Sequence, residues 1–81
     1  MSRIKDNDKK ANIVGERVKE ARIRAGLSQE VLSIKLETLA VYVCRGSISR
    51  IENGERTVTD IEIDGISQIL KVTLDYLFGR A

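Results

Sequence analysis

The chain has 81 residues, of which 42% are hydrophobic, 32% are charged and 4% are aromatic, and its formal net charge is +2. This composition is typical of one small soluble domain, whose modest core would gain stability from a partner subunit. There is no histidine and only one cysteine, which argues against histidine acid–base catalysis, Cys/His dyads, zinc clusters and internal disulfides. We therefore expect no enzyme activity, no metal and no cofactor.

Two further features bear on location and partners. No apolar stretch approaches the ~20 residues that span a bilayer, and no secretion signal is evident, so we expect a cytoplasmic protein. Residues 1–56 carry 12 Lys and Arg against 8 Asp and Glu, whereas residues 57–81 carry 2 against 4. The basic half is a candidate anion-facing side, although an ordinary solvated surface explains the same charges equally well.

The chain begins with a polar arm of mixed charge, residues 1–11, which we expect to be flexible, and a folded domain over residues 12–79. The first helix is predicted at 12–25, with Asn12 as N-cap and Gly26 after its end, where a positive φ favours glycine. An apolar stripe at helical spacing supports this helix; its members are Val14, Val18, Ala21 and Ala25.

Ser28 is the predicted N-cap of a second helix, whose buried stripe comprises Leu32, Leu36 and Leu39. The next stretch, LAVYVC at 39–44, is apolar and β-prone, but the chain offers no second strand to pair with it. We therefore predict an extended turn in which Val41 and Val43 pack inward.

A third helix is predicted at 45–53, ending at Gly54. Ile48, Ile51 and Glu52 share one face of this helix, and Arg45 lies in its first turn. The opposite face is polar and consists of Gly46, Ser49, Arg50 and Asn53.

The fourth helix has a complete start signal: Thr59 and Glu62 form a capping box, flanked by the hydrophobic staple of Val58 and Ile63. It is predicted to reach about residue 71 and to contain Gly65, which costs about 1 kcal/mol relative to alanine. Its predicted buried residues are Ile63, Ile66, Ile69 and Leu70. Thr73 then caps a short fifth helix that ends at Gly79 and buries Leu74, Leu77 and Phe78.

Three segments of this sequence resemble one family when taken together: GERVKEARIRAGLSQEVLSIKL (15–36), SISRIENGERTVTDIE (47–62) and ILKVTLDYLFG (69–79). They resemble the Cro/phage-repressor (XRE-type) helix-turn-helix family over about residues 13–79. The resemblance implies an all-α, five-helix, lambda-repressor-like DNA-binding domain. In that family the second and third helices are the reading unit, and the third lies in the major groove.

The resemblance also assigns roles to individual residues. The positions that correspond to base-reading side chains hold Arg45, Gly46, Ser47, Ser49 and Arg50. Those that correspond to contacts with the DNA backbone hold Ser28, Gln29, Asn53 and Arg56. The chemistry agrees, because arginine can donate two hydrogen bonds to guanine and a helix N-terminus can bind a phosphate; the alternative is a solvated helix face.

The resemblance further implies a structural salt bridge between Arg22 and Glu52, which would link the first helix to the third; the alternative is two exposed charges. The sequence departs from the family at one place, because eleven residues separate Leu36 from Ile48, about five more than the short turn of the family requires. This insertion could alter the angle between the second and third helices.

Cys44 lies at the start of the third helix, where a helix N-terminus lowers the pKa of a thiol. A redox-controlled switch of DNA binding is one interpretation of this position. A small residue that simply packs well is the other.

The sequence thus predicts a homodimeric transcriptional repressor that binds double-stranded DNA at a palindromic operator. The alternatives are an antitoxin-type protein-binding module and a DNA-binding fragment of a larger regulator. Candidates for the dimer surface are Leu39–Val43, Tyr76 and Phe78.

Overall fold

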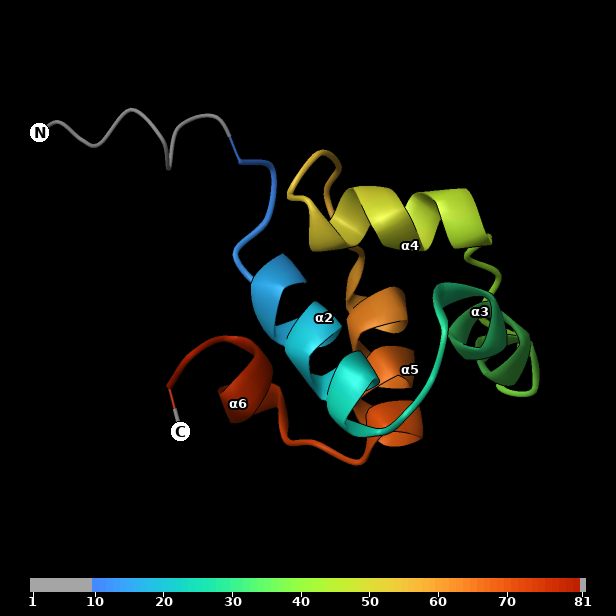
Figure 1. Ribbon diagram of the computed structural model, residues 1–81. Helices are drawn as coiled ribbons and strands as arrows, with labels where there is room; N and C mark the ends of the chain where they lie inside the picture. The colour runs from blue at the N-terminus through green and yellow to red at the C-terminus, as the bar shows by residue number, and fades with distance from the viewer. Residues whose placement is uncertain (1–9, 81) are drawn as a thin grey trace, which may run out of the picture.

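The computed structural model describes residues 10–80, and this part of the chain forms five α-helices joined by short turns, with no strand (Figure 1). The predicted all-α class is therefore confirmed. The helices are α2 (Gly15–Arg24), α3 (Gln29–Glu37), α4 (Arg45–Glu52), α5 (Asp60–Leu70) and α6 (Leu74–Leu77). The arm predicted at residues 1–11 lies outside the described residues except for Lys10 and Ala11.

A single apolar core lies where the helices meet. Helix α2 packs against α4, α5 and α6, while α3 packs against α4 and α5. In Figure 1, α4 crosses the top of the molecule, and α5 lies behind α2. All five helices contribute to the core, and its fully buried side chains are Val14, Val18, Leu32, Leu36, Ile48, Ile51, Ile66 and Leu77.

The first helix begins at Gly15, three residues later than predicted, and Asn12 is not its N-cap residue. Asn12 lies outside the helix, but its Oδ1 still accepts hydrogen bonds from the N–H groups of Val14 and Gly15, at 3.0 and 2.8 Å. Its Nδ2 donates to the carbonyls of Ile51 and Arg56, at 3.1 and 2.8 Å. One amide side chain thus satisfies the start of α2 and attaches it to the end of α4.

Ser28 caps α3, as predicted, by accepting a hydrogen bond from Val31 N–H at 3.0 Å.

The turn between α3 and α4 is extended and half buried, as predicted. After α3 ends, Ala40 takes a left-handed conformation with φ 61°, and the chain then runs past α3 with Val41 and Val43 buried. The sequence predicted the additional residues in this turn.

Two leucines predicted as buried are exposed: Leu39 to 38% and Leu74 to 44%. Leu39 lies beyond the last residue of α3, so the helical periodicity that predicted its burial no longer applies. Leu74 opens the four-residue helix α6. Both leucines line one surface hollow of about 810 Å³ beside α5, together with Ile61 and Phe78.

The signals at the remaining helix ends are confirmed. Thr59 Oγ1 accepts from Glu62 N–H at 3.1 Å and Glu62 Oε1 accepts from Thr59 N–H at 3.0 Å, which completes the capping box of α5. Thr73 caps α6. Of the predicted stripe on α5, Ile66 and Leu70 are buried and the other two isoleucines are partly buried.

Candidate nucleic-acid interface

Helix α4 presents a polar face because its apolar side is fixed in the core. Ile48 and Ile51 are fully buried, so the opposite side of the helix faces outward along the top of the molecule (Figure 1). The structure brings together the five predicted base-reading residues on this helix. Of these, Arg45, Gly46 and Arg50 are exposed, and Ser47 and Ser49 are partly buried.

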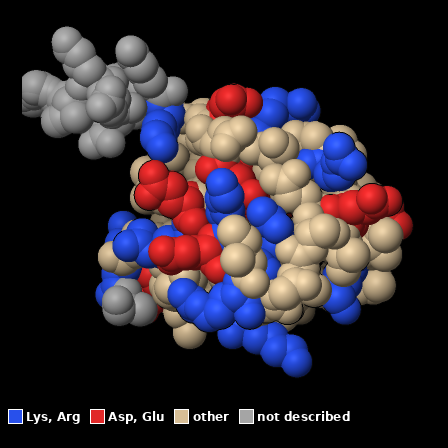
Figure 2. All heavy atoms as spheres, viewed as in Figure 1, with Lys and Arg blue, Asp and Glu red and all other residues tan. Residues whose placement is uncertain are grey.

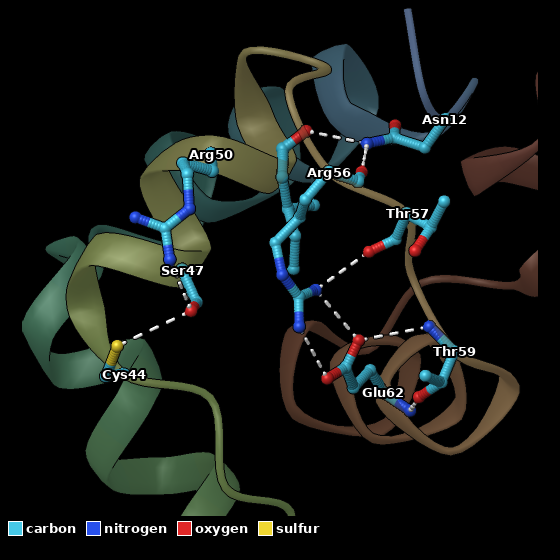
Figure 3. A network of polar contacts seen from close by, with 9 residues as sticks. Asn12, Cys44, Ser47, Arg50, Arg56, Thr57, Thr59 and Glu62 are labelled. Atoms are coloured by element: carbon cyan, nitrogen blue, oxygen red, sulfur yellow. Dashed lines mark hydrogen bonds and ion pairs between the residues drawn. The ribbon is translucent and has the colours of Figure 1, made fainter.

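A chain of polar contacts runs along the first turns of α4 (Figure 3). Arg50 Nη2 donates to Ser47 Oγ at 3.2 Å, and the Sγ of Cys44 lies 3.5 Å from the same oxygen. The hydrogen bond with the Ser47 hydroxyl lowers the pKa of the Cys44 thiol, and the backbone N–H of Ser47 adds to this effect. A thiol with a lowered pKa therefore lies beside the predicted base-reading residues. It is exposed, so it does not pack into the core.

The predicted backbone-contact residues have different surroundings. Ser28 and Asn53 are exposed at the start of α3 and just after α4. The side chain of Gln29 is directed into the protein, where its Nε2 donates to Glu52 Oε1 at 3.1 Å. One amide hydrogen of Gln29 and the N–H groups at the start of α3 remain for a phosphate.

Arg56 is held by an ion pair that the sequence reasoning missed. Its Nη1 and Nη2 donate to the two carboxylate oxygens of Glu62 at 3.0 and 3.1 Å, and Nη1 also donates to the Thr57 carbonyl at 2.9 Å (Figure 3). The Arg56 guanidinium holds the pKa of the Glu62 carboxyl below its usual value. The signal was present in the sequence, since the capping-box glutamate follows this arginine by six residues.

The predicted salt bridge between Arg22 and Glu52 is confirmed. Arg22 Nε donates to Glu52 Oε2 at 2.6 Å and Nη2 donates to Oε1 at 3.1 Å, and both residues are buried. Arg22 Nη1 also donates to the Leu27 carbonyl at 2.8 Å. The last residue of α4 is therefore fixed to α2 and, through Gln29, to α3.

Surface charge alone does not single out the interface. In Figure 2, basic side chains lie along the upper edge, where α4 runs, but acidic side chains are interleaved with them. Among residues 10–80, no group of acidic, cysteine or histidine side chains could hold a metal ion. None of the described helices is long and apolar enough to cross a membrane.

Some of the candidate residues for the dimer surface already have contacts within the domain. Tyr76 is half buried, and its hydroxyl donates to Glu20 at 2.9 Å, while the Arg24 guanidinium lies 5.6 Å from its ring centre. Val41 and Val43 of the extended turn are buried. Phe78 is half buried and lines the hollow beside α5.

Comparison with known proteins identifies the class. A family model for helix-turn-helix proteins (HTH_3) matches residues 18–77, so the chain belongs to this family, the Cro/C1-type (XRE) helix-turn-helix proteins. Among solved structures, the chain is similar to the P22 c2 repressor protein in complex with synthetic operator 9T in the presence of Tl⁺. That match has a TM-score of 0.72 and 23% sequence identity and covers 86% of this chain and 98% of that one. No curated protein matches.

The fold is therefore the lambda-repressor-like helix-turn-helix fold that the sequence resemblance implied. Within it, α3 and α4 are the second and third helices of the domain, the pair to which the sequence resemblance assigned the reading unit. Family and fold together make the protein a DNA-binding regulator.

Proposed function

We propose that the protein is a transcriptional repressor that binds a palindromic operator as a homodimer and reads the major groove with α4. The observation that carries this proposal is the outward polar face of α4, whose inner side is fixed by Ile48 and Ile51 in the core and whose last residue is fixed by the Arg22–Glu52 pair. A reading helix must be held in one orientation for its side chains to meet defined base edges.

Individual roles follow from the chemistry of the side chains. Arg45 and Arg50 would each donate two hydrogen bonds to guanine, and Ser47 and Ser49 would contact less selective positions. Gly46 has no side chain, so the backbone of α4 could approach the DNA closely there. Contacts to the DNA backbone would come from Ser28, Gln29, Asn53 and Arg56, the last while it remains paired with Glu62.

The remaining parts of the proposal concern the setting of this activity. In a homodimer, the two copies of α4 would enter successive major grooves about 34 Å apart, which requires a two-fold symmetric operator. We propose a cytoplasmic location and a binding function without enzyme activity. The similarity to a repressor solved with operator DNA supports the choice of ligand.

The test is selection of bound duplexes from random DNA, with wild type, Arg50→Ala and a control, Arg24→Ala, on the surface of α2. Wild type should enrich a palindrome whose half-sites lie one helical turn apart. Arg50→Ala should bind about 1–3 kcal/mol more weakly and lose its preference at one base pair, while Arg24→Ala should retain the wild-type pattern.

Other outcomes would change the proposal in defined ways. Enrichment of a single half-site would retain DNA reading and remove the dimer. No enrichment at low salt would contradict DNA reading and favour the alternative of an antitoxin-type protein-binding module.

A further inference from the structure

Tyr42 is an exposed aromatic side chain in the lengthened turn before α4. It is 76% exposed, more than any other large hydrophobic side chain among residues 10–80. Its hydroxyl has no hydrogen-bond partner within the described residues. The fold therefore makes no evident use of this side chain.

The backbone that carries Tyr42 is fixed on both sides. Val41 and Val43 are buried, at 6% and 3% exposure. Val41 N–H donates to the Leu36 carbonyl at 3.0 Å, and Ser33 Oγ donates to the Val43 carbonyl at 2.7 Å. Because side chains alternate along an extended segment, burial of both neighbours directs Tyr42 outward. An aromatic ring on a fixed backbone loses little entropy when it makes a contact.

Tyr42 lies beside the residues that we propose read bases. It lines a surface hollow of about 670 Å³ together with Cys44, Arg45 and Ser47 at the start of α4. The surface formed by the first turn of α4 therefore continues onto Tyr42. Duplex DNA seated on α4 would extend past the N-terminus of this helix, where its sugar–phosphate backbone flanks the bases being read.

The hollow itself is lined by charges of both signs. Glu30 and Glu37 of α3 line it together with Arg45, and because the two carboxylates repel a phosphate, the contact requires the phosphate to lie outside the hollow. A phenol hydroxyl stays uncharged and can donate to a phosphate oxygen. Tyrosine is one of the residues that make such contacts to the DNA backbone.

We propose that Tyr42 is a further DNA contact, whose hydroxyl donates to one phosphate at the edge of each half-site. The proposal rests on the function proposed above and assigns a role to the lengthened turn, which positions this side chain next to the reading helix. The contact fixes the position of α4 on the duplex and reads no base itself.

The test compares wild type, Tyr42→Phe, Tyr42→Ala and a control, Ile23→Ala, which removes an exposed side chain of α2, on the operator enriched by wild type. Ethylation of single phosphates shows which of them each protein needs. Wild type should need one phosphate in each half-site, outside the bases read by α4, and Tyr42→Phe should no longer need it. Tyr42→Phe should bind about tenfold more weakly per half-site, as expected for loss of a hydrogen bond to a charged group. Tyr42→Ala should bind at least as weakly, and Ile23→Ala should behave as wild type.

Two further readouts separate a DNA contact from a structural role. All variants should unfold near the wild-type temperature, since Tyr42 and Ile23 are 76% and 58% exposed. The salt dependence of binding should not change, because no charge is removed.

The contact would be overturned if Tyr42→Phe binds with wild-type affinity and needs the same phosphates. It would also be overturned if the loss of affinity follows a loss of folded protein. If wild type enriches no DNA, both the proposed function and the Tyr42 contact fail. If wild type enriches an operator and Tyr42→Phe binds it equally well, only the Tyr42 contact fails.

Discussion

At the scale of single residues, Cys44 shows how a neighbouring hydroxyl and the backbone N–H groups at the start of α4 change the chemistry of a thiol. It is the N-cap of α4 but makes no capping hydrogen bond with its side chain. The Ser47 hydroxyl, which itself accepts from Arg50, is the largest influence lowering the pKa of the thiol. An exposed thiol with a lowered pKa contains more thiolate near neutral pH, and the thiolate is the reactive form.

We therefore expect Cys44 to be alkylated at lower pH than an ordinary thiol. The rate of reaction with iodoacetamide should reach half its maximum below pH 9.0, which is the ordinary pKa of a cysteine thiol. Ser47→Ala should move this midpoint upward, because it removes the largest stabilising contact of the thiolate. The protein unfolded in urea is the control, and equal midpoints for folded and unfolded protein would contradict the expectation.

The redox interpretation of Cys44 is tested by DNA binding. Wild type and Cys44→Ser should be compared on the same operator under oxidant and under reductant. Equal affinities in all four measurements would establish that Cys44 has no redox role in DNA binding. A loss of affinity for oxidised wild type alone would establish the redox switch.

At the scale of helices, two glycines differ in whether the packing of the helices requires them. A Cβ on Gly15 would collide with the carbonyl oxygen of Ile51, so glycine permits the start of α2 to pack against the end of α4. A Cβ on Gly46 would meet only Arg50 Nη1, at 3.8 Å. Packing requires the first glycine, and nothing in the described fold requires the second.

Alanine should therefore have opposite effects at the two positions. Gly15→Ala should destabilise the domain by about 1–3 kcal/mol, because the backbone of α4 must move. Gly46→Ala should stabilise it by up to about 1 kcal/mol, the usual gain for alanine over glycine inside a helix. Urea unfolding of both variants measures this contrast, and a stabilised Gly15→Ala protein would show that the helices can separate without cost.

The ion pair of Arg56 and Glu62 joins the loop after α4 to the start of α5, and its contribution to stability depends on pH. The pKa of Glu62 is lowered from 4.5 in the folded protein. A carboxyl whose folded pKa is below its unfolded pKa stabilises the fold above the unfolded pKa, and this contribution disappears as pH falls through the folded pKa.

Glu62→Gln should thus cost about 1 kcal/mol at pH 7, and the difference from wild type should shrink below pH 4.5. Glutamine still accepts within the capping box, so the difference reports the charge pairing. Urea unfolding at pH 7, 4.5 and 3 measures it, with Glu55→Gln as control at an exposed carboxylate of the same loop. A difference that is constant across these pH values would contradict the assignment.

The helices that the sequence predicted best are those whose end signals are local. The capping box of α5 and the glycine after α4 lie within a few residues of the helix ends that they fix, so periodicity and capping located both helices. The start of α2 was predicted three residues early, because it depends on a contact with Ile51 far along the chain. The exposure of Leu39 likewise depends on where α3 ends.

The candidate site was predicted to a similar extent and for similar reasons. Positions on the outer face of α4 follow from helical periodicity once Ile48 and Ile51 are placed in the core. The partners of Gln29 and Arg56 do not, since Glu52 and Glu62 reach them through the tertiary fold. The sequence therefore indicates which side chains can contact DNA. It does not indicate which of them already form hydrogen bonds or ion pairs within the protein.

At the scale of the whole molecule, the orientation of α4 depends on one buried charge cluster. Glu52 ends α4 and accepts from Arg22 of α2 and Gln29 of α3, so three helices meet at one carboxylate. Apolar packing alone would hold α4 in one orientation less firmly than these hydrogen bonds do, because the hydrophobic effect is not directional. We infer that the cluster sets the angle of the reading helix.

The last prediction separates stability from this orientation. Glu52→Gln leaves the Arg22 charge buried without its counter-charge, and such a change costs about 3–5 kcal/mol, a large part of the total stability of a small domain. The double variant Arg22→Met/Glu52→Met removes both charges and should recover most of that stability, because buried ion pairs are often replaceable by apolar side chains. It also removes the acceptor of Gln29 and the directional contacts of α4, so its affinity for the operator should stay at least tenfold below wild type. Urea unfolding and DNA titration of the two variants test both statements. Wild-type affinity in a stable double variant would mean that the pair serves folding alone and that the core by itself orients α4.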